Sequence, residues 1–180
     1  MSLLPVLAVL LSAQVATSDL YARRVSNRWL LCAAVLATGA LLWSWMTGAA
    51  FPGMHLLGLL LGLLSLLPFY AIGWMGAGDV KYFAVLGLLL GASALLPIWI
   101  VASLLAGLHA TVVVLAPGLR ASLPLRAQLL QARVREHWQT GPAAQRLQAL
   151  RQGRTGIPYA AYLAAATLGY LFWQGQGAAP

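Results

Sequence analysis

Residues 73 to 81 read Gly73-Trp74-Met75-Gly76-Ala77-Gly78-Asp79-Val80-Lys81, and they place a carboxylate between two long apolar segments. The whole chain of 180 residues contains only three acidic residues. An ionisable group near lipid is energetically costly unless it faces a polar interior or a partner. Asp79 is therefore the first candidate for a functional group.

The composition indicates the class of protein. Hydrophobic residues make up 61% of the chain and charged residues only 8%. Several segments of about 20 residues carry no charge, which is typical of membrane-spanning helices. The net charge of +8 comes without aromatic-basic interleaving or a known binding motif, so we expect no nucleic-acid partner. We predict an all-α integral membrane protein, with residues 1–180 forming one membrane-embedded domain in contact with lipid.

The apolar segments predict six spans. Residues 82–117 contain 36 residues without a formal charge, about 54 Å of helix, which is far more than one crossing requires. Gly91, Ser93 and Pro97 indicate a bend within this segment. The predicted spans are residues 2–18, 29–47, 54–72, 80–95, 97–117 and 157–173.

Two segments allow a second interpretation. The first span could be a cleavable signal peptide, but its positive charges follow the apolar run instead of preceding it, so we expect a retained span. Residues 118–155 form an arginine-rich cytoplasmic loop, part of which is spaced as an amphipathic helix for the membrane surface. A docking surface for a partner is the alternative for this loop.

The basic residues predict the orientation. All eleven Lys and Arg lie in residues 23–28, at residue 81 and in residues 120–154. With six spans, these three segments lie on the same side of the membrane, which the positive-inside bias makes cytoplasmic. A single crossing over residues 82–117 would instead place the arginine-rich loop opposite the other two clusters.

The same topology brings two carboxylates to one membrane edge. Asp19 follows the first span and Asp79 begins the fourth, so both are expected at the cytoplasmic side. Two carboxyl groups a few ångströms apart share a proton, and such a pair can act as general base and general acid on water and a peptide carbonyl. Each residue also has a structural alternative: Asp79 as a helix N-cap, and Asp19 as an ion-pair partner of Arg23 or Arg24.

Three short motifs resemble those of one family. Residues 19–27, Asp-Leu-Tyr-Ala-Arg-Arg-Val-Ser-Asn, resemble the first aspartate motif of the type IV leader peptidases, or prepilin peptidases. In that motif Arg follows the aspartate by five residues and Asn by eight, which corresponds to Arg24 and Asn27. Residues 76–81 resemble the second motif, GxGD followed by Val-Lys. Residues 156–160, Gly-Ile-Pro-Tyr-Ala, are similar to the proline-aromatic start of the last span.

The resemblance implies a membrane aspartyl endopeptidase of the bacterial inner membrane. Its substrate would be a prepilin or pseudopilin, cut at the cytoplasmic face to remove a basic leader, without a cofactor or metal. The implied catalytic pair is Asp19 and Asp79. The implied supporting residues are Arg24, Asn27, Gly76, Gly78, Lys81 and Pro158.

The cysteine content bears on the subgroup. The chain contains one cysteine and no paired CxxC motifs, whereas larger family members carry such motifs and also methylate the new N-terminus. The chain therefore resembles the short, peptidase-only branch that serves tight-adherence pili. Three alternatives stay open: a related GxGD peptidase acting on another substrate such as preflagellin, a carboxylate-dependent ion-coupled transporter, and a non-catalytic assembly scaffold.

Overall fold

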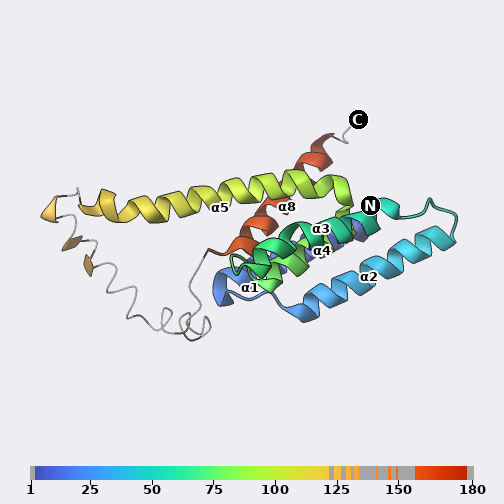
Figure 1. Ribbon diagram of the computed structural model, residues 1–180, viewed down its shortest axis with the longest axis horizontal. Coiled ribbons are helices and arrows are strands. Elements are labelled where there is room, and N and C mark those ends of the chain that lie inside the picture. Colours follow the sequence, from blue (N-terminus) through green and yellow to red (C-terminus); the bar gives the residue numbers. More distant parts are fainter. Residues whose placement is uncertain are drawn as a thin grey trace.

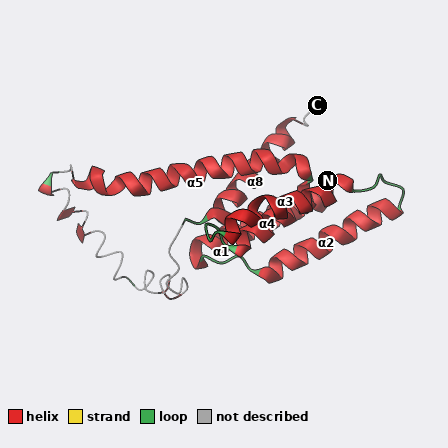
Figure 2. Cartoon of the chain, viewed as in Figure 1, coloured by secondary structure: helices red, strands yellow, loops and turns green. Residues whose placement is uncertain are grey.

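The computed structural model describes residues 3–121 and 157–177, together with residues 124–126, 129, 130, 132, 133, 141, 146 and 149. This part of the chain contains long helices and no strand, which confirms the prediction of an all-α fold (Figures 1 and 2). The helices are α1 (Leu3–Ala22), α2 (Asn27–Met46), α3 (Gly53–Ala71), α4 (Ala77–Leu90), α5 (Ala92–Ala121) and α8 (Tyr159–Gly177).

Among the residues that the structure describes, four helices are long and apolar enough to cross a membrane: α1, α2, α3 and α5. They indicate a multi-pass membrane protein. Helix α4 has only 14 residues, about 21 Å, which is shorter than the roughly 30 Å hydrocarbon layer of a bilayer. The exact number of crossings therefore stays a prediction.

Helix α4 is the centre of the bundle. It contacts each of the other five described helices, and Val80 and all residues from Tyr82 to Leu89 are buried. Figure 1 shows α3 lying alongside α4, with α2 at the outer edge. The acidic residue at the start of α4 is thus attached to the element whose position is most constrained by packing.

Small residues bring α3 and α4 together. A Cβ added to Gly62 of α3 would lie 2.7 Å from the carbonyl oxygen of Phe83 and 2.9 Å from Cα of Ala84, and Gly58 faces the backbone of Gly87 in the same way. Such close backbone approach through a Gly-x-x-x-Gly spacing is a common way for helices to pack where lipid removes the hydrophobic driving force.

The helix ends correct several predicted boundaries. The chain bends at Gly91, whose φ of 85° lies in the left-handed region that glycine adopts readily. The predicted boundary between residues 95 and 97 is therefore wrong, because Pro97 lies inside α5. Proline inside a helix is tolerated in membrane proteins when neighbouring groups satisfy the freed carbonyl.

The other ends shift by a few residues. Helix α5 continues to Ala121, past the predicted loop start at residue 118. Helix α1 continues to Ala22, so Asp19 lies within the helix and not in the link that follows it. Helix α8 covers residues 159–177 where 157–173 was predicted. Most of the predicted loop over residues 118–155 lies outside the described residues.

Candidate active site

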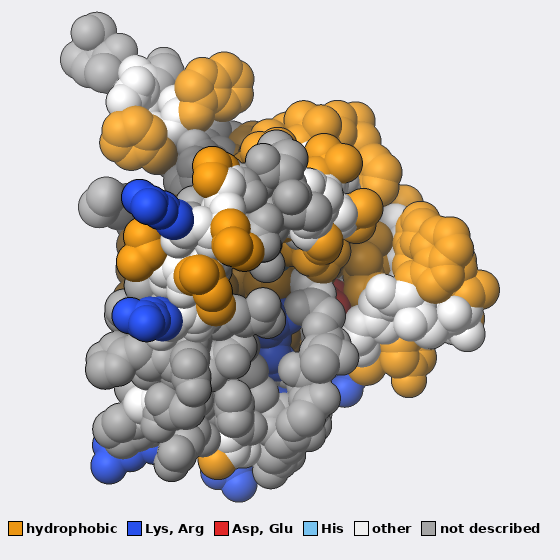
Figure 3. Space-filling model, turned by 90° about the vertical axis from the view of Figure 1, so that its left-hand side faces the viewer, with side chains coloured by type: hydrophobic (Ala, Val, Ile, Leu, Met, Phe, Trp, Pro, Cys, Tyr) orange, Lys and Arg blue, Asp and Glu red, His pale blue; other side chains and the backbone are white. Residues whose placement is uncertain are grey.

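One pocket of about 510 Å³ forms where the end of α1, the link to α2, the start of α4 and the start of α8 meet. Figure 3 looks onto this end of the molecule and shows an acidic side chain in a hollow, with Lys or Arg side chains beside it. Among the residues singled out from the sequence, those that line the pocket are Asp19, Arg24, Asn27, Gly76, Gly78, Asp79 and Lys81. Pro158 is buried between two further lining residues, Ile157 and Tyr159.

Asp19 is held in the last turn of α1. Its side chain is only 7% exposed, and its Oδ2 accepts a hydrogen bond of 3.0 Å from the backbone N–H of Ala161 in α8. The guanidinium of Arg23 interacts favourably with the Asp19 carboxylate. The ion-pair alternative thus has a structural counterpart at Arg23, but Asp19 also binds a backbone amide of a distant helix, which an ion pair at the membrane surface does not require.

Asp79 lies in the first turn of α4. The N-cap position belongs to Gly76, whose backbone N–H donates to Oδ2 of Asp79 over 3.1 Å. Asp79 is therefore not the N-cap residue itself, but its carboxylate satisfies an amide at the helix start, where negative charge is favourable. The carboxylate also interacts with the backbone amide of Ala160 in α8 and is repelled by Asp19.

The first turn of α8 thus faces both carboxylates. The N–H groups in the first turn of a helix have no acceptor within their own helix, so those of Ala160 and Ala161 are available to Asp79 and Asp19. Pro158 precedes the helix and lacks an N–H of its own. Sequence reasoning identified Pro158 but not the two alanines, because a backbone donor leaves no signature in side-chain composition.

The glycines before Asp79 serve close packing. Gly76 has a φ of −76°, which any residue can adopt, so its backbone conformation does not require glycine. A Cβ on Gly78 would lie 2.9 Å from Cβ of Val25 in the link after α1. Gly78 therefore allows the α1–α2 link to pack directly against the start of α4.

A second contact joins the two aspartate motifs. The Lys81 Nζ lies 3.4 Å from Oδ1 of Asn27, a long hydrogen bond between exposed side chains. The backbone carbonyl of Arg24 accepts a hydrogen bond from the hydroxyl of Ser18, which ties the link back to α1. Arg23, in the same link, has a φ of 52°, an uncommon conformation for a residue with a side chain. The link is thus shaped by local contacts that the sequence alone does not reveal.

The two carboxyl groups of the pocket can carry out acid–base chemistry. Two carboxyl groups in one pocket disfavour double ionisation, so the pair can hold one proton and offer both a base and an acid. The pocket opens next to three basic side chains, those of Arg23, Arg24 and Lys81. Within the described part of the chain, His, Cys, Asp and Glu do not form a group of three or more that could hold a metal ion.

Comparison with known proteins gives one match. A model of the type IV leader peptidase family matches residues 6–111 of the 180 residues. The matched segment includes both aspartates, most of α1, all of α2 to α4 and much of α5, and it ends before α8. Neither the comparison with curated proteins nor the comparison with solved structures gives a match.

Proposed function

The chain belongs to the type IV leader peptidase family, and we propose that it is a membrane aspartyl endopeptidase in which Asp19 and Asp79 form the catalytic pair. One observation carries the proposal: the two acidic residues of the described chain, 60 positions apart by their numbers, line the same pocket. Each carboxylate is bound by a backbone amide. Hydrogen bonds from backbone amides fix the orientation of a carboxylate without adding a competing charge.

The chemistry follows from the shared proton. The ionised carboxylate takes a proton from a water molecule as the water oxygen attacks the scissile carbonyl carbon, and the protonated carboxylate donates to the carbonyl oxygen. The tetrahedral intermediate then loses the amine, which leaves with a proton. No covalent bond to the enzyme forms. Arg24, Asn27, Gly76, Gly78, Lys81 and Pro158 are proposed to shape this site and not to react.

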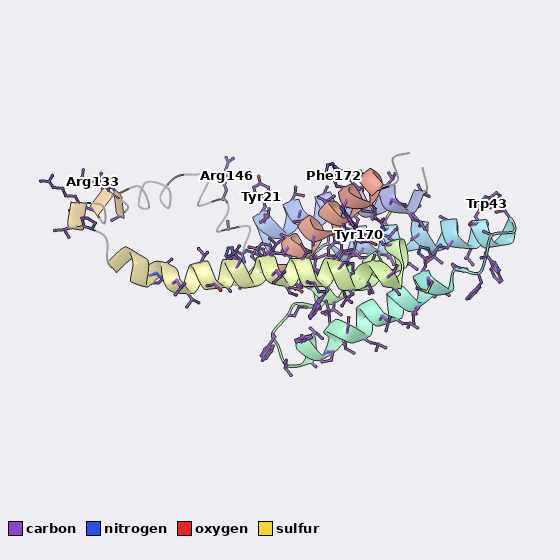
Figure 4. All side chains as sticks on the ribbon, turned by 90° about the horizontal axis from the view of Figure 1, so that it is seen from above. Tyr21, Trp43, Arg133, Arg146, Tyr170 and Phe172 are labelled. Carbon is purple, nitrogen blue, oxygen red and sulfur yellow. The ribbon has the colours of Figure 1, made fainter. Side chains whose placement is uncertain are left out.

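We propose that the site faces the cytoplasm in a six-span topology of the bacterial inner membrane, with residues 1–180 as one domain. The pocket lies beside Arg23, Arg24 and Lys81, and cytoplasmic segments of membrane proteins carry an excess of Lys and Arg. Figure 4 shows Arg133 and Arg146 toward the same end of the molecule as Tyr21, with Trp43 at the opposite end. The basic residues on this end support the assignment.

The proposed substrate is a prepilin or pseudopilin with a hydrophobic segment that begins next to the cut. The pocket edge is itself cationic, so it offers no attraction for the charges of a basic leader. We propose that recognition depends on the extended backbone around the scissile bond and on the hydrophobic segment in the membrane. The chain is proposed to serve tight-adherence pili without a methyltransferase activity.

The test uses purified chain reconstituted in lipid vesicles with a pilin precursor. Proteolysis should shorten the precursor, and mass spectrometry of the product should place the cut just before the hydrophobic segment. The same vesicles should show no carboxylate-dependent proton flux. Proton flux without cleavage of any precursor would favour a transporter and overturn the proposal.

A further inference from the structure

The first turn of α8 is attached to α5 by two tyrosine hydroxyls. The hydroxyl of Tyr159 lies 3.2 Å from Oγ of Ser103, and the hydroxyl of Tyr162 lies 2.7 Å from Nδ1 of His109. The rings of His109 and Tyr162 are also in contact, with centroids 5.9 Å apart. Two side chains three positions apart, on the same face of α8, therefore bind one neighbouring helix.

The residues between these tyrosines face the opposite way. Ala160 and Ala161 are buried; the N–H of Ala161 donates to Asp19, and the backbone amide of Ala160 interacts with Asp79. The same turn thus contacts α5 through its side chains and the two carboxylates through its backbone. A displacement of this turn relative to α5 would move both amide donors away from the carboxylates together.

We propose that Tyr159 and Tyr162 are positioning residues, whose hydroxyl bonds to Ser103 and His109 hold the first turn of α8 where its backbone amides orient the two aspartates. This inference rests on the proposed function of the same site. It assigns a role to α8 and to the middle of α5, and α8 lies beyond the segment that the family model matches.

The two tyrosine hydroxyl bonds matter more for the precise position of α8 than for the stability of the bundle. Hydrogen bonds between membrane helices contribute little to stability on average, because the unfolded chain also finds partners for the same groups. Displacement of catalytic groups by about 1 Å can nevertheless reduce a rate by about 100-fold. Loss of a tyrosine hydroxyl should therefore affect catalysis more than folding.

The experiment measures kcat and KM for cleavage of a pilin precursor by Tyr159→Phe, Tyr162→Phe and the double variant. We expect each single change to lower kcat roughly tenfold with little change in KM. The control is Tyr170→Phe, whose hydroxyl accepts a hydrogen bond of 2.8 Å from Gln174 within α8 itself. Tyr170 lies farther along α8 (Figure 4), and its variant should match the wild type.

The hydrogen bond between Tyr159 and Ser103 can also be tested by changing Ser103 of α5. This second route keeps the inference testable if a tyrosine variant fails to fold. Ser103→Ala should lower kcat as Tyr159→Phe does, and Ser103→Thr, which keeps the hydroxyl, should restore it. Wild-type kcat in both tyrosine variants, while the wild-type protein cleaves and Asp19→Asn does not, would overturn the inference and leave the proposed function intact. A precursor that the wild-type protein does not cleave would instead count against the function itself.

Discussion

The backbone N–H of Ala161 donates a hydrogen bond of 3.0 Å to Oδ2 of Asp19, although 142 positions separate the two residues. The bond joins the start of the last described helix to the end of the first. Because the two helices enclose the pocket from opposite ends of the sequence, the site exists only when the whole bundle is assembled.

This bond can be removed without a change of side-chain chemistry in the pocket. In Ala161→Pro the donor is lost, but the residue occupies the first turn of α8, where proline breaks no intrahelical hydrogen bond. We expect a loss of kcat of roughly 100-fold, because the Asp19 carboxylate must turn away from the proline ring. The control, Ala161→Gly, keeps the donor and should retain most of the activity in the same cleavage assay.

Gly78 provides a second test of how the pocket is shaped. In Gly78→Ala the new Cβ would lie 2.9 Å from Cβ of Val25, so the link after α1 has to move. We expect activity to fall by about tenfold. The double variant Gly78→Ala/Val25→Ala should recover activity, because the smaller side chain removes the clash. The control is Gly39→Ala, whose new Cβ meets no atom within 4 Å and which should keep wild-type activity. If the double variant does not recover activity, the contact between Gly78 and Val25 does not shape the pocket.

The packing of α3 on α4 predicts a change of stability. In Gly62→Val the side chain would collide with the backbone at Phe83 and Ala84, and overpacking of this kind costs about 1–3 kcal/mol. Thermal unfolding in detergent should show a lower midpoint for this variant. Gly107→Ala, whose Cβ would enter open space, should unfold as the wild type does. Equal midpoints for Gly62→Val and the wild type would show that the two helices do not pack this closely.

The pair of carboxylates predicts the pH dependence of cleavage. Activity should fall at low pH, because the carboxylate that acts as base becomes protonated, and should also fall at high pH, because the other loses the proton that it donates. The measurement is kcat/KM against pH over the range in which the protein stays folded, checked by circular dichroism. A profile with only an acidic limb would indicate that a single ionised group suffices.

Part of this structure could be predicted from the sequence and part could not. The apolar segments predict the helices. The distribution of Lys and Arg predicts that Asp19 and Asp79 lie at the same end of the bundle. Gly91, one of the three residues that indicate the bend, does lie at it in the left-handed conformation, but the boundary predicted between residues 95 and 97 is wrong because Pro97 lies inside α5. Apolar runs alone do not distinguish a proline inside a helix from one at its end.

The details of the site depend on contacts that no local pattern encodes. The amides of Ala160 and Ala161 act through the backbone, so any residue except proline could supply them. The buried hydrogen bond of 2.7 Å from Tyr82 to Ser12 joins α4 to α1 and lies within apolar runs that read only as membrane spans. His109 of α5 forms a hydrogen bond to Tyr162 of α8, because a polar side chain in an apolar helix needs a partner.

The most direct test of the account is single-turnover cleavage of a pilin precursor by Asp19→Asn, Asp79→Asn and the double variant. Asparagine keeps the size of the side chain but can neither accept the proton from water nor donate as a carboxylic acid. Each single change should lower the rate by at least about 1,000-fold, and the double change should add little, because groups that act as a unit are not additive. Glu136→Gln, which alters the third acid of the chain, should cleave at the wild-type rate. Normal cleavage by either aspartate variant would contradict the two-aspartate site.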